Sequence, residues 1–342
     1  MENKERITSI IQKKKHDRPA CICPGGMMNM VTTQLLTEGN FSFEEAHTDG
    51  EKMAQVAEYA YDRGCFENVG VPFCMTVEAE QLGAKVDLGD NTKEPRVIEY
   101  GMKKLEEVDG LPTFDLEHGR IKAIIDAIRI MKKDKPDVPV VGNITGPIST
   151  ATSVIDPSPF YAGLRKKGEL CHRFLAHVTK ELIRFGQAMV EAGADIIMIA
   201  DPSATGEILG PKFFEEFTVT YLNELIDGVK AINPDVVTIV HICGQMTPVL
   251  EQTDHIKSDV LSFDAMVPLK EIRKYMKDRP IMGNVSTYAI EGQTPDKVKQ
   301  LVHHCVEQGM DIISPACGLG MGSPLANVQA VLQGTEEEAT CP

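Results

Sequence analysis

The stretch Gly193-Ala-Asp-Ile-Ile-Met-Ile-Ala-Asp-Pro-Ser-Ala204 contains an unbroken apolar run, Ile196 to Ala200, which ends at an aspartate and a proline. Such a run, without alternating polar residues, is typical of a strand buried on both faces of a parallel sheet. The residues before it, Gly168 to Ala192, repeat apolar side chains at helical spacing. A long helix feeding a buried strand predicts the α/β class.

The same alternation extends in both directions along the chain. Further short apolar or β-branched runs predict strands at Pro19–Cys23, within Glu67–Phe73, and at Val138–Asn143, Val236–Val240, Asp259–Phe263, Pro280–Asn284 and Asp311–Ser314. Helical patterns lie at Lys4–Lys14, Phe43–Arg63, Glu117–Lys133, Pro211–Ile232, Leu269–Met276, Pro295–Gln308 and Pro324–Leu332.

About eight strands that alternate with helices predict a (β/α)₈ TIM barrel, a fold that takes roughly 250 residues. We expect a single domain over residues 1–342, with an N-terminal helix and an insertion near residues 76–115. Within the insertion, Lys85-Val-Asp-Leu-Gly89 predicts one strand of a hairpin. A doubly wound open sheet is the alternative, but no Gly-x-Gly-x-x-Gly follows an early strand, which disfavours its nucleotide-binding form.

Composition excludes several classes of protein. The 342 residues carry 35 basic and 50 acidic side chains, a net charge of −15, which argues against nucleic-acid binding. No apolar run reaches the ~18 residues of a membrane span, and Met1 to Lys15 has no apolar signal-peptide core. We therefore expect a cytoplasmic protein whose nine cysteines stay reduced, so that some of them are free to bind metal.

The segment Val240-His-Ile-Cys-Gly244 is the sharpest chemical signal. His241 and Cys243 come at the end of a strand, where residues two apart point to the same side. Cys317 follows the last predicted strand, and in a barrel the carboxyl ends of all strands meet at one mouth. One imidazole and two thiolates are a zinc-selecting set that leaves one coordination position open, as in catalytic sites. The alternative is that the three residues merely pack in a core, as we expect of Cys21 and Cys23.

Other polar residues also follow predicted strands. Asp201 and Asp264 are predicted to be catalytic, and a second set is predicted to bind substrate: Asn143, Ser203, Asn284 and Gly318. Each of these residues fits equally well as a helix cap or a turn residue.

The motif His241-Ile-Cys243 with the distant Cys317 resembles the zinc motif of the methylcobamide:coenzyme M methyltransferases. Five further segments agree with that family: Val71–Gly83, Val141–Pro147, Gly193–Ala204, Gly283–Val285 and Pro315–Gly318. The resemblance covers about residues 5–333. It implies membership of the uroporphyrinogen decarboxylase superfamily and a (β/α)₈ barrel. The decarboxylases carry an arginine-rich N-terminal signature, but Pro19–Gly26 has no arginine, so decarboxylation is not expected.

The resemblance also implies a reaction. A methyl group passes from a methylated corrinoid protein to a thiol such as coenzyme M, which is activated on zinc held by His241, Cys243 and Cys317. Asp201 would orient His241, and the backbone of Gly318–Ser323 would receive an anionic acceptor. None of the nine histidines lies in an Asp-x-His-x-x-Gly cobalamin motif, so the corrinoid is expected to arrive on a partner protein.

Two other functions remain open at this stage. Related barrels run the opposite half-reaction and take a methyl group from a methylated amine or aryl ether to cobalt(I), with zinc as a Lewis acid. A non-catalytic protein that delivers or stores zinc or a corrinoid fits the same residues.

Overall fold

The computed structural model describes residues 1–26 and 29–340 and contains one eight-stranded parallel sheet. Its order is β1-β10-β9-β8-β7-β6-β5-β2, so from β2 to β10 each barrel strand lies beside the next one in sequence, and the last strand, β10, lies beside the first, β1. The (β/α)₈ barrel is therefore confirmed, and the doubly wound sheet, whose strand order reverses, is wrong. The strands are β1 (Ala20–Cys21), β2 (Val69–Val71), β5 (Val140–Thr145), β6 (Ile196–Ala200), β7 (Val237–Ile242), β8 (Val260–Phe263), β9 (Ile281–Val285) and β10 (Ile312–Pro315).

The first and second barrel strands are joined mainly through side chains. The Glu67 N–H donates to the Cys21 carbonyl at 2.9 Å, next to the start of β2. The Asn68 amide accepts from the Cys23 N–H and donates to the Cys23 carbonyl, both at 2.9 Å. Cys21 and Cys23 are fully buried here, which confirms them as core residues. The Asn68 side-chain amide thus makes the hydrogen bonds that a neighbouring strand would otherwise make, and it links the first and second barrel strands.

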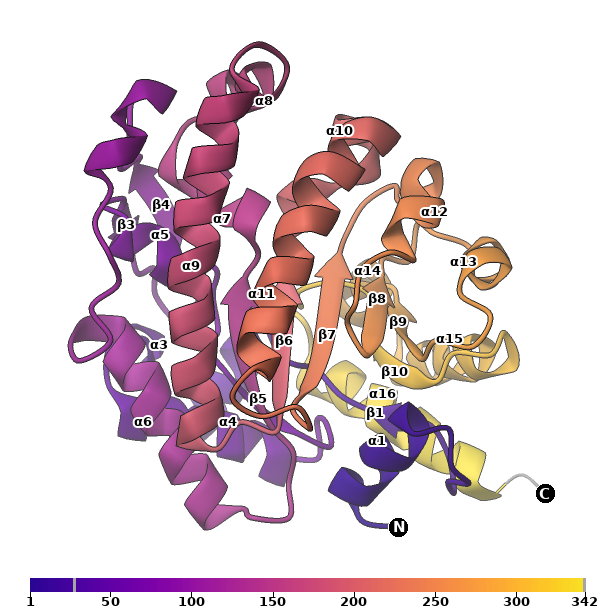
Figure 1. The fold of residues 1–342 in the computed structure, drawn as a ribbon. Helices are drawn as coiled ribbons and strands as arrows, with labels where there is room; N and C mark the ends of the chain where they lie inside the picture. The colour runs from indigo at the N-terminus through magenta and orange to yellow at the C-terminus, as the bar shows by residue number, and fades with distance from the viewer. Residues whose placement is uncertain (27–28, 341–342) are drawn as a thin grey trace.

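Helices surround the sheet, and Figure 1 shows α9 and α11 covering the strands β5, β6 and β7. Within the described ranges, no helix is both long enough and apolar enough to cross a membrane. The helices are α1 (Asn3–Ile11), α2 (Thr33–Gly39), α3 (Phe43–Ala46), α4 (Gly50–Asp62), α5 (Val77–Gln81), α6 (Gly119–Asp134), α7 (Pro147–Val154), α8 (Pro157–Lys166), α9 (Gly168–Ala192), α10 (Gly206–Phe213), α11 (Thr220–Lys230), α12 (Leu250–Thr253), α13 (Leu269–Tyr275), α14 (Thr287–Gly292), α15 (Pro295–Glu307) and α16 (Leu325–Glu337).

Two predicted helices are interrupted in the structure. The helix expected over Phe43–Arg63 is divided into α3 and α4, because the Asp49 carboxylate accepts from the N–H groups of Glu51 and Lys52 and starts a new helix. The helix expected from Pro211 does begin there, since Gly210 has φ 64° and ψ 169°. It then passes through a π-helical turn, Phe214–Val219, into α11.

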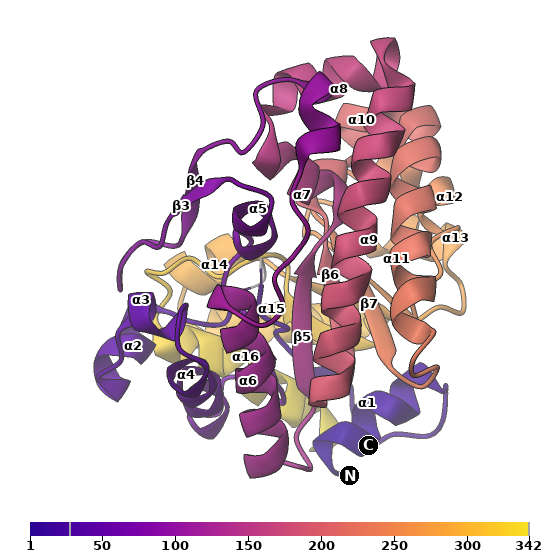
Figure 2. The same cartoon turned by 60° about the vertical axis from the view of Figure 1, so that its left-hand side comes forward.

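The insertion holds the expected hairpin, formed by β3 (Lys85–Asp87) and β4 (Arg96–Glu99). Figure 2 shows it beside α5, outside the barrel sheet. The opposite end of the molecule is covered by α1, which lies below the starts of the strands in Figure 1. An ion pair at 2.6 Å joins Lys4 of α1 to Asp195, just before β6. The helix therefore covers the amino-terminal end of the barrel and leaves the carboxyl ends of the strands to form the site.

Candidate metal centre

The three predicted metal ligands come together at the carboxyl ends of the fifth and eighth barrel strands. β7 is longer than expected and includes His241, while Cys243 lies one residue beyond its end and Cys317 two residues beyond the end of β10. The ligand atoms of these three side chains all lie within 4.8 Å of one another. One ion can therefore contact all three residues, although His241 and Cys317 lie 76 positions apart in sequence.

The environment of His241 fits a metal ligand. The imidazole is fully buried, and its Nδ1 lies 2.9 Å from the Ser262 hydroxyl of β8. Its Nε2 is also buried and has no hydrogen-bond partner among the described residues. A buried polar atom without a partner costs free energy, and a bound metal ion satisfies it. The donor set of one nitrogen and two sulfurs is the one that zinc prefers.

The two cysteines share a proton in a way that prepares a thiolate. A hydrogen bond from the Cys243 thiol lowers the pKa of Cys317 to about 5, and the nearby His241 acts in the same direction. The same hydrogen bond, together with burial, raises the pKa of Cys243 well above its usual range. The thiolate is the form that binds metal, and this hydrogen bond favours that form at Cys317.

The loop after Cys243 is fixed by a glycine and a carboxylate. Gly244 has φ +81°, and a side chain there would stand 2.9 Å from the Thr205 hydroxyl. Asp264 accepts from the Gly244 N–H at 3.1 Å and from the Met266 N–H at 3.0 Å. Asp264 therefore positions the backbone that carries Cys243, and its predicted catalytic role stays a prediction.

A cavity of about 510 Å³ opens beside the metal ligands. Cys317 and Gly318 line it from the loop after β10, and Asp264 lines it from the loop after β8. A small substrate in this cavity would contact the sulfur of Cys317. Gly318 thus stays a predicted substrate-binding residue.

Asp201 does not orient His241, contrary to the expectation from the sequence. Its carboxylate is fully buried and accepts from the N–H groups of Ile148 at 3.2 Å and Ser149 at 2.7 Å, at the start of α7. Burial raises the pKa of Asp201 to about 6 despite these bonds. Only its backbone reaches His241, through an N–H to carbonyl bond of 2.9 Å. The residue caps a helix, because Gly146 leaves the space that its carboxylate occupies.

Ser203 and Asn143 are also held by structural bonds. The Ser203 hydroxyl accepts from Thr152 at 2.9 Å, and its carbonyl accepts from the Tyr161 hydroxyl at 2.7 Å. Asn143 lies within β5, not at its end, and its amide nitrogen donates to the carbonyls of Pro24 and Val71. Its amide oxygen is buried without a hydrogen-bond partner among the described residues, and the predicted substrate-binding role of Asn143 stays a prediction.

Asn284 lies away from the metal ligands. Its amide oxygen accepts from the Cys305 thiol of α15, and its nitrogen donates to the Asp264 carbonyl at 3.2 Å. It lines a second pocket, about 310 Å³ in volume, with residues of α13 and α15. The side chain therefore lies toward the helical layer, and this placement removes Asn284 from the candidate site.

Ser262 is the functional residue that the sequence reasoning missed. It pairs with His241 in the β7–β8 ladder, so the two side chains project to the same side of the sheet. The sequence does contain a signal for Ser262. It is a polar residue within an otherwise apolar predicted strand, and it lies two residues before Asp264.

The Ser262 hydroxyl fixes the ring orientation of His241, so its loss is expected to weaken metal binding. We expect Ser262→Ala to lower zinc affinity by about 10–100-fold, the usual effect of removing a group that orients a metal-binding histidine. Competition with a chromophoric chelator measures this affinity. Ser258→Ala, which removes a buried hydroxyl just before the same strand, is the control and should bind zinc normally. Equal affinities for the two variants would contradict the assigned role.

Comparison with known proteins gives this centre its context. Residues 2–337 match the uroporphyrinogen decarboxylase (URO-D) family. The chain is 32% identical to a methylcobamide:CoM methyltransferase of Methanosarcina acetivorans over 96% of both chains. It is 30% identical to another from Methanosarcina barkeri over 98% of this chain and 97% of that one. The solved structure of a methyltransferase from Methanosarcina mazei superposes with a TM-score of 0.90 at 28% identity, covering 98% and 99% of the two chains. The chain therefore belongs to the uroporphyrinogen decarboxylase family, as one of its methyltransferases and not as a decarboxylase.

Proposed function

We propose that this protein transfers a methyl group from a methylated corrinoid protein to a thiol, with zinc held by His241, Cys243 and Cys317. The observation that carries the proposal is the clustering of these three ligand atoms within 4.8 Å beside a substrate-sized cavity that Cys317 lines. The methylcobamide:CoM methyltransferases similar to this chain support the same reaction.

The acceptor thiol is unreactive while protonated, because its pKa lies near ~8.5 and the thiolate is the nucleophile. When bound, zinc lowers the pKa of a coordinated thiol and keeps its sulfur lone pair available for attack. The thiol would release its proton to solvent, and its sulfur would attack the methyl carbon of the methylated corrinoid. The carbon–cobalt bond would break with its electron pair left on cobalt, so the products would be a methyl thioether, cobalt(I) and one proton.

The residues of the chain position these groups. Ser262 holds the His241 imidazole in one orientation, and Asp264 fastens the loop that follows Cys243. His241, Cys243 and Cys317 would hold the zinc ion and would leave a position for the acceptor sulfur. Since Cys317 both belongs to the ligand group and lines the cavity, the acceptor enters from that cavity.

The methyl donor is too large to enter and is proposed to dock over the mouth of the barrel on its partner protein. Two apolar side chains at the edge of the cavity are unusually exposed, Met266 at 56% and Tyr288 at 87%. Large exposed apolar groups beside a site are typical of an interaction surface. Here they suit the flat, largely apolar face of a corrin ring.

Removal of the metal tests the proposed function. We expect the zinc-loaded protein to demethylate methylcobalamin in the presence of 2-mercaptoethanol, and the chelator-treated protein to lose this activity until zinc is restored. Absorbance of the corrinoid follows the reaction, and bound zinc is measured in the same samples. An equal rate of methylcobalamin demethylation without zinc would contradict the proposed function.

Two other outcomes would identify the alternative functions. Methyl transfer from a methylated amine or aryl ether to reduced corrinoid, without transfer to any thiol, would indicate the opposite half-reaction. Zinc bound by four protein ligands with no exchangeable position would indicate a delivery protein. X-ray absorption distinguishes this case, because an added thiol then brings no new sulfur to about 2.3 Å.

A further inference from the structure

We propose that the groove between α8 and α10 is a docking site for an acidic amphipathic helix of a partner protein. The groove has a volume of about 210 Å³, and Tyr161, Leu164 and Arg165 of α8 line it together with Ile208 and Phe213 of α10. Figures 1 and 2 both show the two helices close together at the top of the molecule, beyond the carboxyl ends of β6 and β7. An amphipathic helix that lays its apolar face into such a groove is a recurring mode of protein recognition.

The floor of the groove is apolar and partly open to solvent. Leu164 and Leu209 line it and are buried, whereas Ile208 is 49% exposed and Phe213 is half-buried. Pockets that enclose cofactors or drug-sized ligands have volumes of roughly 300–1,000 Å³, so this groove is smaller than most of them. It therefore suits an anchoring side chain of a protein better than a free small molecule.

The rim of the groove is positively charged, although the whole chain carries a net charge of −15. Arg165 and Lys212 each lie 5.7 Å from the centroid of the Phe213 ring, so both charges stay beside the apolar floor. Neither cation forms an ion pair with a described residue, and no carboxylate is among the described residues that line the groove. The carboxylate of Glu207 on α10 lies instead toward Gly244, where a side chain would stand 3.2 Å from its Oε1.

These unpaired cations favour a partner helix that carries carboxylates around its apolar face. Screening confines the influence of the other charges of the chain to about 8 Å at physiological salt, so contacts at the groove decide which helix binds. An acidic helix gains two attractive contacts there, whereas a basic helix would place like charges beside Arg165 and Lys212.

The groove adjoins the loop that carries Cys243. A side chain at Gly206, the first residue of α10, would stand 3.2 Å from the Gln245 carbonyl, and one at Gly244 would stand 2.9 Å from the Thr205 hydroxyl. A bound partner helix would therefore lie at the edge of the barrel mouth. This inference does not depend on the proposed function, because no candidate metal ligand lines the groove.

Two synthetic helical peptides of equal length test the charge preference of the groove. Both carry leucine at positions i, i+3, i+4 and i+7, and their remaining positions are mostly glutamate in one peptide and mostly lysine in the other. Each fluorescently labelled peptide is titrated with the zinc-loaded full chain, and its anisotropy is recorded. We expect the glutamate peptide to bind about tenfold more tightly than the lysine peptide, with a smaller ratio at high salt.

Two variants with matched controls locate the binding site of the glutamate peptide. Ile208→Asp is expected to weaken binding by about tenfold, and its control is Ile232→Asp, at a 42% exposed isoleucine between α11 and β7. Arg165→Glu is expected to weaken binding by about threefold, and its control is Lys270→Glu, at an exposed lysine of α13. The thermal midpoint of each variant shows whether it is folded. All four residues lie outside the proposed metal centre, so each variant should demethylate methylcobalamin at the rate of the unmodified protein.

Several results would overturn the inference. They are tighter binding of the lysine peptide, binding of neither peptide, and an equal loss of affinity in the Ile208 and Ile232 variants. Loss of methyl transfer with unchanged peptide binding would instead contradict only the proposed function.

Discussion

Replacing Cys317 by alanine is expected to abolish thiol-dependent methyl transfer, with a fall in kcat/KM on the order of 10³-fold, because several kcal/mol of electrostatic stabilisation depend on the metal. The side chain belongs to the group of three that could hold the proposed ion in the part of the chain that the structure describes, and of these three Cys317 lines the cavity. The hydrogen bond from Cys243 lowers the pKa of Cys317, which favours its thiolate form. The variant therefore loses a candidate ligand and a side chain of the cavity wall together.

The same variant is expected to remain folded. Cys317 is half-buried in a loop after β10, so its truncation leaves little cavity in the core. Zinc content by elemental analysis, the rate of corrinoid demethylation and the thermal midpoint are measured on each protein. The matched control is Cys171→Ala, which removes a fully buried thiol from α9 and should keep zinc and activity while losing some stability. Full zinc content together with full activity in the Cys317 variant would refute the assigned metal centre.

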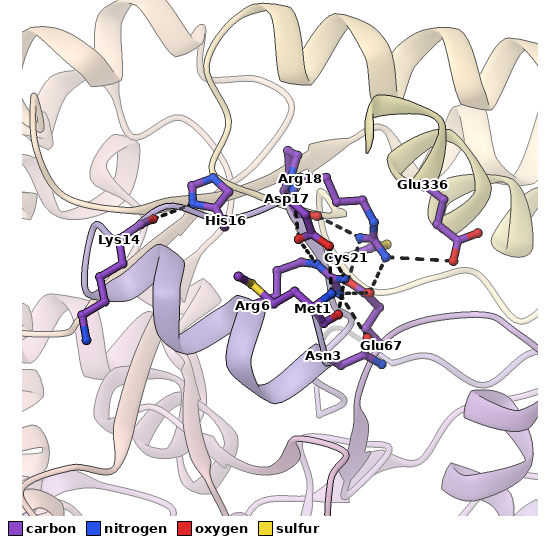
Figure 3. A network of polar contacts seen from close by, with 11 residues as sticks. Met1, Asn3, Arg6, Lys14, His16, Asp17, Arg18, Cys21, Glu67 and Glu336 are labelled. Atoms are coloured by element: carbon purple, nitrogen blue, oxygen red, sulfur yellow. Dashed lines mark hydrogen bonds and ion pairs between the residues drawn. The ribbon is translucent and has the colours of Figure 1, made fainter. Parts of the chain in front are cut away.

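Replacing Glu67 by alanine is expected to destabilise the fold by about 3–5 kcal/mol, the usual cost of breaking a buried ion pair from one side. Glu67 is 3% exposed and lies two residues before the start of β2. Figure 3 shows its carboxylate between two arginines, Arg6 of α1 at 2.6 Å and Arg18 at 2.7 Å. The other carboxylate oxygen accepts the Cys21 N–H at 2.7 Å. The substitution leaves two buried guanidinium groups and a backbone donor of β1 without this partner.

The effect of this substitution is measured by equilibrium unfolding in denaturant together with the thermal midpoint. Glu336→Gln is the control. The Glu336 carboxylate lies 4.0 Å from Arg18 in the same network, but the Glu336 side chain is 56% exposed. An exposed pair of this kind contributes about 0–1 kcal/mol. If the Glu67 and Glu336 variants unfold at the same denaturant concentration, the buried contacts of the Glu67 carboxylate do not stabilise the fold as expected.

Local patterns were sufficient to predict the barrel and to name the candidate metal ligands. The unbroken apolar run Ile196–Ala200 indicates burial on both faces, and this pattern can be read from the segment itself. His241 and Cys243 are two residues apart, and side chains at this spacing point to the same side of any extended strand. Cys317 joins them because parallel barrel strands all end at one mouth, so its position after a strand was enough to place it.

The roles of the other polar residues depended on partners that no local pattern specifies. Asp201 and Asn284 both follow apolar runs, yet one caps α7 and the other bonds Cys305 of α15. Ser262 is linked to His241 by the register of two strands, and Glu291 meets the Gly320 loop from a helix that the sequence did not predict.

The sequence by itself determined the order of strands and helices, the barrel and the three candidate metal ligands, because apolar periodicity and strand ends can be read from short segments. Only the tertiary structure decided which hydrogen bonds the polar side chains make, how Glu67 and Asn68 close the barrel, and which side chains line the cavity beside Cys317. The physical reason is that a hydrogen bond or a charge contact acts over a few ångströms between residues that lie tens to hundreds of positions apart in the chain.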